Sequence, residues 1–288
     1  MSDCISPQGG RNGGRDLRAD LHLHSLFSDG AYTPDEICAI AKARGLSLLS
    51  ITDHDSLNGE DEKRSAAEKQ GLLYLSGWEI SAYEDGYKLH VLGYGCRRGK
   101  DYLQFMQKRT EAAYIRAQDS LRKFASLGVE ITMDEVNACR ADLTSPIHTM
   151  HIARAAAKKL NLSEGETYLN YLARGKAANS TYGRPTPQEA IEVIHASGGV
   201  AVLAHPGRIF MPQPQLEDRI KCFTRQGLDG IECYYTTHTQ RQTEYFLSLA
   251  DGLNLLKTGG SDTHIEDETH QIGAPAFTPD SRFLDKFF

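Results

Sequence analysis

Histidines and carboxylates recur in short clusters along this 288-residue chain. One cluster spaces His22 and His24 two residues apart, and another joins Asp53 directly to His54. Imidazole favours transition metals and carboxylates are shared with harder ions, so the mixture suits Zn, Mn or Fe. The candidate residues are Asp20, His22, His24, Asp29, Asp53, His54, Glu79, His90, His205, Asp262 and His264. Their types predict a site for divalent metal ions.

Each cluster taken alone also has a purely structural explanation. The spaced histidine pair could be one buried and one surface residue, and Asp53-His54-Asp55 could form a hydrogen-bonded turn. His90 alone would fit a core position. These structural explanations do not account for all the clusters together. Burying several imidazoles and carboxylates at one end of a fold costs free energy unless an ion compensates their charge. The combination therefore favours metal binding.

Seven short apolar runs, which we interpret as strands, carry these residues. They cover residues 18–24, 46–52, 72–77, 88–94, 199–205, 228–234 and 253–259. Most are continuously apolar, as is typical of parallel strands covered on both faces. In parallel α/β barrels the catalytic residues gather at the C-terminal ends of the strands. Six of the seven runs deliver an imidazole or carboxylate, which predicts one shared site.

Helix signals separate these strands. Thr33-Pro34-Asp35-Glu36 offers an N-cap, a proline at the first helical position and acids in the first turn, and Gly45 is a plausible stop. The segment starting at Thr186 repeats this pattern. Alternation of strands and helices predicts an α/β fold, either a parallel barrel or a doubly wound sheet.

Residues 99–185 interrupt the alternation. They contain helical patterns over 102–127, 133–141, 151–160 and 164–174 but no strand pattern, which predicts a helical insertion domain between the fourth and fifth strands. Residues 16–98 and 186–288 would then form the barrel domain. The Gly- and Ser-rich residues 1–15 lack an apolar core, so we expect a flexible tail and not a signal peptide.

Composition limits the partners of the protein. The formal net charge is −6, unlike the basic face of a general nucleic-acid binder, so duplex nucleic acid is not an expected partner. No run of about 18 apolar residues predicts a membrane span. The six cysteines include no C-x-x-C pair, which predicts free, mostly buried thiols and a cytoplasmic location.

At the metal-type residues the chain resembles the PHP superfamily, named for polymerase and histidinol phosphatase domains. The matching motifs are Asp20–Ser25, Thr52–Asp55, Glu79, His90, Ala204–Pro206 and Ser261–His264. With their strands they span residues 18–97 and 186–270. Within the superfamily the chain looks like small stand-alone phosphoesterases with a helical insertion. That group includes nucleotide 3′,5′-bisphosphate phosphatases, RNA 5′-end exonucleases and a cyclic phosphodiesterase.

The resemblance implies a distorted (β/α)7 barrel that holds three divalent ions of Mn, Fe or Zn. The first ion would be bound by His22, His24, Glu79 and Asp262. Glu79 would bridge to a second ion, held also by His90 and His205, and the third would be bound by Asp29, His54 and His264. Asp20 and Asp53 are expected to orient imidazoles.

The resemblance also implies a mechanism in which a metal-bound hydroxide attacks phosphorus in line. His205 or His264 could protonate the leaving alkoxide, although both are also expected as metal ligands. For the substrate, Ser145–Arg154 resembles a segment that touches substrate phosphate in the group. His151 matches that segment, Thr149 replaces its first arginine, and His148 is an extra histidine expected to face solvent.

Lys176 and Arg208 match positions that could clamp a second phosphate. The expected substrate is a small phosphorylated sugar, with phosphoribosyl 1,2-cyclic phosphate favoured; two sequential hydrolyses would release inorganic phosphate. Alternatives are a nucleotide 3′,5′-bisphosphate phosphatase and a 5′–3′ exonuclease on short RNA. Arg109, Arg116 and Arg122 could form a basic strip for RNA, although a solvated helix face explains them more simply. The non-enzymatic alternative is a structural metal-binding domain.

Overall fold

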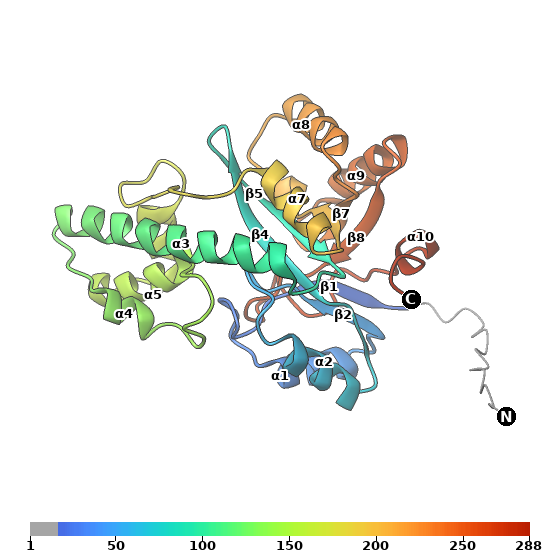
Figure 1. Cartoon of the computed structure of the whole chain (residues 1–288), viewed down its shortest axis with the longest axis horizontal. Coiled ribbons are helices and arrows are strands. Elements are labelled where there is room, and N and C mark those ends of the chain that lie inside the picture. Colours follow the sequence, from blue (N-terminus) through green and yellow to red (C-terminus); the bar gives the residue numbers. More distant parts are fainter. Residues whose placement is uncertain (1–16) are drawn as a thin grey trace.

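The computed structural model describes residues 17–288, which fold around two sheets (Figure 1). The first sheet is parallel and contains, in order, β1 (Ala19–Leu23), β2 (Leu48–Ile51) and β3 (Leu73–Tyr74). The second contains, in order, β4 (Gly77–Glu84), β5 (Tyr87–Tyr94), β6 (Val200–Leu203), β7 (Gly230–Tyr235) and β8 (Leu256–Gly260). The predicted flexible tail, residues 1–15, lies outside the described residues.

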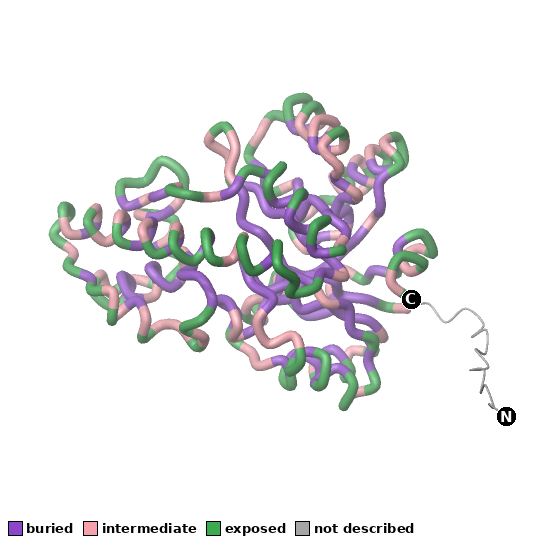
Figure 2. Tube along the Cα trace, in the orientation of Figure 1, coloured by how far each residue is buried: buried purple, intermediate pink, exposed green. Residues whose placement is uncertain are grey.

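Two isolated bridges join the sheets into a distorted barrel. Leu23 pairs with Thr263 beyond β8, and His54 beyond β2 pairs with Glu79 of β4. Buried residues concentrate in the strands, as the purple segments of Figure 2 show. The predicted α/β class with parallel strands is confirmed, and the bridge at Glu79 already places two metal-type residues side by side.

The second sheet departs from an all-parallel arrangement. The predicted run 72–77 ends where a separate strand, β4, begins, and β5 runs antiparallel to both β4 and β6. Asp85 and Gly86 form the two-residue turn between β4 and β5, with positive φ values of 48° and 83°. Asp-Gly favours such hairpin turns and is the sequence signal for this one. Because β5 is reversed, its N-terminal half, with His90, lies beside the C-terminal end of β6.

Helices cover the outer faces of the sheets. They are α1 (Pro34–Ala43), α2 (Glu60–Lys69), α7 (Pro187–Ala196), α8 (Gln213–Arg225), α9 (Gln240–Gly252) and the short α10 (Ser281–Leu284), with a 3-10 turn, η2 (Pro206–Arg208), after β6. Helices α1 and α7 begin as predicted. Thr33 accepts the N–H of Glu36, and Thr186 accepts that of Glu189, which completes a capping box at each start.

Between β5 and α7 the described chain contains helices and no strand. They are α3 (Lys100–Ser126), α4 (Met133–Asn137), α5 (Thr149–Leu160), α6 (Glu164–Thr167) and a π-helical turn, η1 (Tyr168–Leu172). Figure 1 shows them beside the sheets, with the long α3 reaching away from the barrel. They share a core that includes Phe124, Val136 and Leu172. The division into a barrel and an insertion domain remains a prediction.

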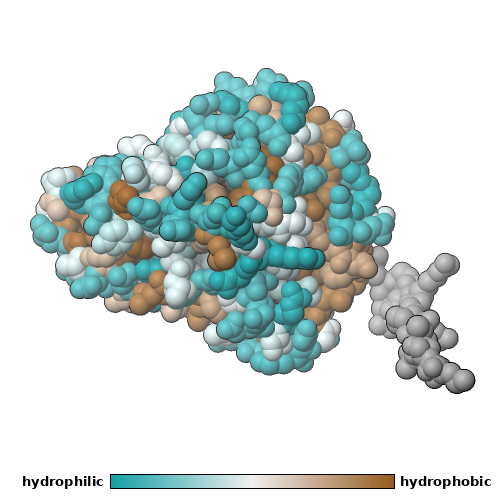
Figure 3. Space-filling view, in the orientation of Figure 1, coloured by the Kyte–Doolittle hydropathy of each residue, from teal (hydrophilic) through white to brown (hydrophobic). Residues whose placement is uncertain are grey.

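The face in Figure 3 is mostly hydrophilic, with scattered hydrophobic patches. The five cysteines within residues 17–288 are all free; three are buried and two, Cys139 and Cys222, are half-buried. Within the same range, no helix combines the length and apolarity that a membrane span requires.

Candidate metal centre

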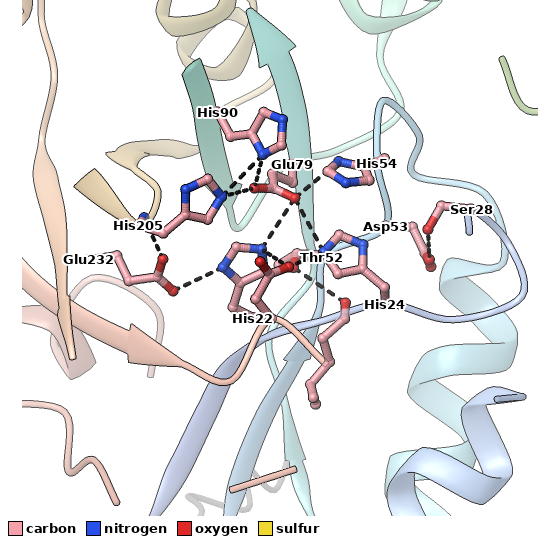
Figure 4. Close-up of polar contacts among 12 residues, drawn as sticks. His22, His24, Ser28, Thr52, Asp53, His54, Glu79, His90, His205 and Glu232 are labelled. Carbon is pink, nitrogen blue, oxygen red and sulfur yellow. Dashed lines mark hydrogen bonds and ion pairs between the residues drawn. The ribbon is translucent and has the colours of Figure 1, made fainter. Parts of the chain in front are cut away.

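The Glu79 carboxylate lies at the centre of the predicted metal-type residues (Figure 4). Its Oε2 is 3.2 Å from the Nε2 atoms of both His22 and His24 and 3.0 Å from His54 Nδ1. Its Oε1 is 2.7 Å from His90 Nδ1 and 3.0 Å from His205 Nε2. One fully buried carboxylate therefore contacts five imidazoles.

The ligand atoms fall into three groups, in each of which they lie within 4.8 Å of one another. The groups are His22, His24, Glu79 and Asp262; His54, Glu79 and His90; and His24, Asp29, His54 and His264. The first equals the set predicted for the first ion. The second contains His54 where His205 was expected, although His205 also contacts Glu79. The third contains His24 in addition. The nine predicted ligands therefore lie together.

Many of these atoms are buried without a hydrogen-bond partner among the described residues. They are His22 Nε2, both ring nitrogens of His24, Asp29 Oδ1, His54 Nδ1, Glu79 Oε2, His90 Nε2, His205 Nδ1 and Asp262 Oδ1. An unsatisfied buried polar atom costs about 1–3 kcal/mol, so a cluster of them needs compensation. Several face one another at 3.0–3.3 Å across ring nitrogens and carboxylate oxygens. Donor sets of this kind fit divalent cations.

The electrostatics of the cluster indicate the same need for positive charge. Burial would lower the pKa of His24, but Asp262 and Glu79 raise it to about 10. Burial would raise the pKa of Glu79, but His90, His22 and His54 hold it well below its usual range. Protons on imidazoles thus balance the carboxylates when no cation does so. A metal ion would replace these protons.

The ends of β6 and β8 turn sharply at metal-type residues. His205 has φ 29° and Asp262 has φ 52°, both in the left-handed region that non-glycine residues seldom adopt. Beside Asp262, Gly260 leaves no room for a side chain, because a Cβ there would lie 2.3 Å from His22 Cβ. Backbone strain of this kind concentrates at functional sites.

Glu232, on β7, supports the site and was missed by the sequence analysis. Its Oε1 lies 2.9 Å from His22 Nδ1, and its Oε2 accepts the backbone N–H of His205 at 2.7 Å. The carboxylate thereby fixes which nitrogen of His22 faces the cluster. A lone acid within an otherwise apolar strand was the available signal.

Asp20 and Asp53 do not orient imidazoles as expected. Asp20 accepts backbone N–H groups of His22, Ser261 and Gly273 at 2.7–3.2 Å. Asp53 accepts the backbone N–H of Ser25 and the hydroxyls of Ser25 and Ser28, and pairs with the buried Lys63 at 2.7 Å. Asp20 lies near the start of β1 and Asp53 just beyond β2, and the nearby N–H and O–H donors use both carboxylates as acceptors.

The three predicted substrate-binding residues lie in different settings. His151 is buried with both ring nitrogens engaged: Nδ1 accepts the His148 N–H at 3.2 Å, and Nε2 is 3.1 Å from the Ser28 carbonyl. It therefore positions the loop before Asp29 and has no nitrogen left for substrate. Lys176 is exposed, and its side chain makes no hydrogen bond or ion pair within residues 17–288. Arg208 Nη1 is 3.2 Å from Asp262 Oδ2, beside the cluster.

Two expectations of solvent exposure are wrong. His148 is only 6% exposed, and its ring centroid lies 5.8 Å from that of His54. Arg109 and Arg116 are also buried, and donate to the carbonyls of Gly183 and Tyr182, whereas Arg122 is exposed. Their spacing of seven residues did place the first two on one face of α3, but that face packs against another segment of the chain.

Comparison with known proteins extends over most of the chain. The model of the family described as the PHP domain matches residues 20–265. A 3′,5′-nucleoside bisphosphate phosphatase of Chromobacterium violaceum is 32% identical over 252 residues, covering 86% of this chain and 88% of that protein. A 5′-3′ exoribonuclease of Haemophilus influenzae is 30% identical, covering 85% and 89%. A phosphoribosyl 1,2-cyclic phosphate 1,2-diphosphodiesterase of Eggerthella lenta is also 30% identical, covering 85% and 93%.

Solved structures share the fold. A protein of Chromobacterium violaceum, described as an amidohydrolase with bound sulfate and no metal, superposes with a TM-score of 0.82 at 29% identity, covering 93% of this chain and 95% of that one. A protein of Bifidobacterium adolescentis described as a metal-dependent phosphoesterase gives 0.81 at 27% identity, covering 93% and 94%.

Proposed function

The chain belongs to the PHP domain family of metal-dependent phosphoesterases, and we propose that it hydrolyses phosphate esters of a ribose that carries a second phosphate. The observation that supports the chemistry most strongly is the convergence of five imidazoles on the buried Glu79 carboxylate, with ligand atoms left unpaired. The non-enzymatic alternative, a structural metal site, has less support because the cluster opens at Arg208 and His264, which solvent reaches.

For the nine clustered ligands we propose three divalent ions of Mn, Fe or Zn. His22, His24, Glu79 and Asp262 would hold the first, Glu79 with His90 and His205 the second, and Asp29, His54 and His264 the third. Bound ions supply positive charge to phosphoryl oxygens and lower the pKa of coordinated water to about 7 in favourable cases. We assign His205 and His264 to metal binding, because each ring lies against a carboxylate of the cluster.

Arg208 is the residue of this chain best placed to hold the phosphoryl group. Its guanidinium is 52% exposed, yet it lies 3.2 Å from Asp262 Oδ2 and 2.8 Å from the Tyr235 hydroxyl. These contacts hold it at the edge of the cluster. A guanidinium so fixed donates charge-assisted hydrogen bonds to phosphate oxygens.

The first candidate substrate is 5-phosphoribosyl 1,2-cyclic phosphate, for which the relative from Eggerthella lenta is named. The second is a nucleoside 3′,5′-bisphosphate. It is supported by Arg184, which donates to Thr149 Oγ1 at 3.1 Å and so places a guanidinium where Thr149 replaces the arginine of the group. The RNA-end alternative loses the basic strip on α3, since Arg109 and Arg116 are buried.

The test is phosphate release from the two compounds, measured side by side with protein loaded with Mn, Fe or Zn. We expect release from at least one of them, and faster turnover of one assigns the natural class. Absence of release from both, in protein that binds metal, would overturn the proposed substrate class. The singly phosphorylated p-nitrophenyl phosphate serves as a separate probe of the metal chemistry.

A further inference from the structure

The 3-10 turn η2 follows the predicted ligand His205 and ends at Arg208, which lies at the edge of the metal cluster. A residue from another part of the chain contacts the middle of this turn. His238, in the loop between β7 and α9, accepts the backbone N–H of Gly207 at its Nε2, with the two nitrogens 3.0 Å apart. His238 is therefore outside the predicted ligand set but holds the turn that joins one ligand to one arginine.

The two ring nitrogens of His238 have complementary partners. Nδ1 lies 3.0 Å from the Cys233 carbonyl oxygen, which can only accept a hydrogen bond, whereas the Gly207 N–H can only donate one. A single arrangement satisfies both contacts, a neutral ring with its proton on Nδ1 and a lone pair on Nε2. The Cys233 carbonyl therefore selects the form of the ring that can accept from Gly207.

The imidazole also fits closely against the turn. A Cβ at position 207 would lie 2.6 Å from His238 Cδ2 and 2.8 Å from its Nε2, so a residue larger than glycine would push the ring away. The ring packs on Tyr235 of β7 and on Phe246 of α9, with centroid separations of 5.3 and 5.0 Å. A strand and a helix thus fix the position of the acceptor.

The turn needs support from outside because the residue that leads into it is strained. His205 has φ 29°, a conformation that persists only when surrounding contacts maintain it. Glu232 holds this end through the His205 N–H at 2.7 Å (Figure 4), and His238 holds the middle through the Gly207 N–H. Arg208 follows directly, so the direction of its side chain depends on how the Gly207 peptide is held.

We propose that His238 is a positioning residue, which places the Arg208 guanidinium for the substrate phosphate by holding the Gly207 peptide. This inference rests on the proposed function, in which Arg208 holds the phosphoryl group. His238 acts only through the turn. Without its Nε2 the Gly207 N–H loses this acceptor and the turn is free to relax, which weakens phosphate binding more than it slows turnover.

The test measures phosphate binding and turnover separately, on the full chain loaded with Mn²⁺. The probes are inorganic phosphate, whose Kd is measured by calorimetry, and p-nitrophenyl phosphate, whose KM and kcat are measured by product release. His238→Leu removes the acceptor without adding volume. It should raise Kd and KM about 3–10-fold, as loss of one hydrogen bond implies, and should change kcat less than about twofold. His238→Gln, whose Oε1 can take the place of Nε2, should restore both constants to within about twofold.

A double-mutant cycle with Arg208→Met shows whether His238 acts through the arginine. In Arg208→Met protein the further change His238→Leu should alter the Kd of phosphate less than about twofold, because the guanidinium that it places is absent. Effects of the two changes that multiply, as those of independent sites do, would overturn the proposal. An unchanged Kd and KM in the single variant His238→Leu would overturn it as well.

His195→Leu is the matched control. His195, in the last turn of α7, pairs with Asp229 at 2.8 Å, so its removal also deletes one hydrogen-bonded imidazole but leaves η2 intact. It should change neither Kd nor KM. Amide hydrogen exchange, which needs no substrate, should show faster exchange of the Gly207 N–H in His238→Leu protein and not in His238→Gln or His195→Leu protein; equal exchange in all three would contradict the contact.

If His238→Leu fails to fold, Gly207→Ala tests the same contact, because its Cβ displaces the imidazole. The same rise in the Kd of phosphate is expected, and no rise would contradict the proposal. Failure of the proposed function looks different: the unmodified, metal-loaded protein would bind inorganic phosphate but release phosphate from neither doubly phosphorylated compound.

Discussion

Individual side chains determine whether the candidate metal centre can bind cations. The Glu79 carboxylate contacts five imidazoles, and the eight other predicted ligands come from five separate stretches of sequence. The residue types and their positions after apolar runs were sufficient to nominate nine ligands. Their role as ligands stays a prediction, but their placement within one cluster follows from strand ends that meet at one edge of the barrel.

Removing a ligand should abolish turnover without unfolding the protein. Asp262 Oδ1 and His22 Nε2 have no hydrogen-bond partner among the described residues, so loss of either side chain removes an unsatisfied atom. Their neighbours Tyr235 and Glu232 keep hydrogen bonds to Arg208 and to the His205 N–H. We expect Asp262→Ala and His22→Ala to release no phosphate while keeping the circular dichroism and the cooperative melting of the unmodified protein. Phosphate release by either purified variant would contradict the ligand assignment.

Glu232 should act through His22. Glu232→Gln exchanges a carboxylate that lies 2.9 Å from His22 Nδ1 for a neutral amide, which weakens the orientation and basicity of that imidazole. Loss of such a supporting carboxylate lowers metal affinity about 10–100-fold in characterised sites. Calorimetric titration of the metal-free variant with metal measures this affinity. An affinity equal to that of the unmodified protein would show that Glu232 does not act on the metal centre through His22.

Metal binding should release protons. In the metal-free protein Asp262 and Glu79 raise the pKa of His24 to about 10 against the opposing effect of burial. His24 therefore holds a proton at neutral pH, and an ion must displace it. Affinity should fall as pH falls, about tenfold per pH unit for each proton released. Titrations in buffers of different ionisation heat count these protons; a count of zero would contradict the protonated state.

Loops and helix starts hold the predicted ligands in place. The loop 25–29, which ends at Asp29, is fixed by contacts to two other parts of the chain. The Ser25 N–H and the Ser28 hydroxyl donate to the Asp53 carboxylate, and Arg154 Nη2 of α5 donates to the Asp29 carbonyl at 2.9 Å. Such contacts join residues 25 and 125 positions apart. Patterns of local spacing predicted α1, α7 and most strands, but they contain no information on contacts at that separation.

The pair formed by Lys63 and Asp53 should contribute strongly to stability. Both side chains are fully buried and lie 2.7 Å apart, and Lys63 keeps the pKa of Asp53 below its usual value although burial opposes this. Lys63→Met would leave a buried carboxylate unpaired and should cost about 3–5 kcal/mol of unfolding free energy. A depressed pKa stabilises the fold above the ordinary pKa of Asp, so this contribution disappears as pH falls into the acid range.

Denaturant unfolding of Lys63→Met measures the loss, and Lys69→Met is the control. Lys69 pairs with Asp35 at 3.0 Å, but both side chains are 60% or more exposed, so its removal should cost under about 1 kcal/mol. Equal small losses in both variants would show that the buried pair adds little.

The direction of β5 is set by one local signal, the Asp85-Gly86 turn of the β4–β5 hairpin. The apolar pattern predicted one strand where β3 and β4 occur, and parallel neighbours for all the strands. Asp85-Gly86 permits the left-handed turn that reverses the chain. The reversal brings His90, in the middle of β5, to the ligand edge, beside Glu79 near the start of β4.

At the scale of the whole molecule, helices between β5 and α7 contact the barrel at the metal site. Helix α5 and its N-cap carry His148, His151 and Arg154, all of which reach toward the loop of Asp29 or the ring of His54. The sequence predicted these helices but not how they pack on the barrel. His148, Arg109 and Arg116 were expected in solvent, because burial that arises from packing between distant segments leaves no periodic signal.

The most direct test of the metal-dependent centre is a titration of metal-free protein with Mn²⁺, following bound metal and phosphate release in one sample. Both proposed substrates and p-nitrophenyl phosphate would be supplied. We predict no release without metal, release that rises with occupancy, and neither full occupancy nor release in Asp262→Ala protein. Phosphate release by metal-free protein, or full occupancy without release from any of the three compounds, would contradict it.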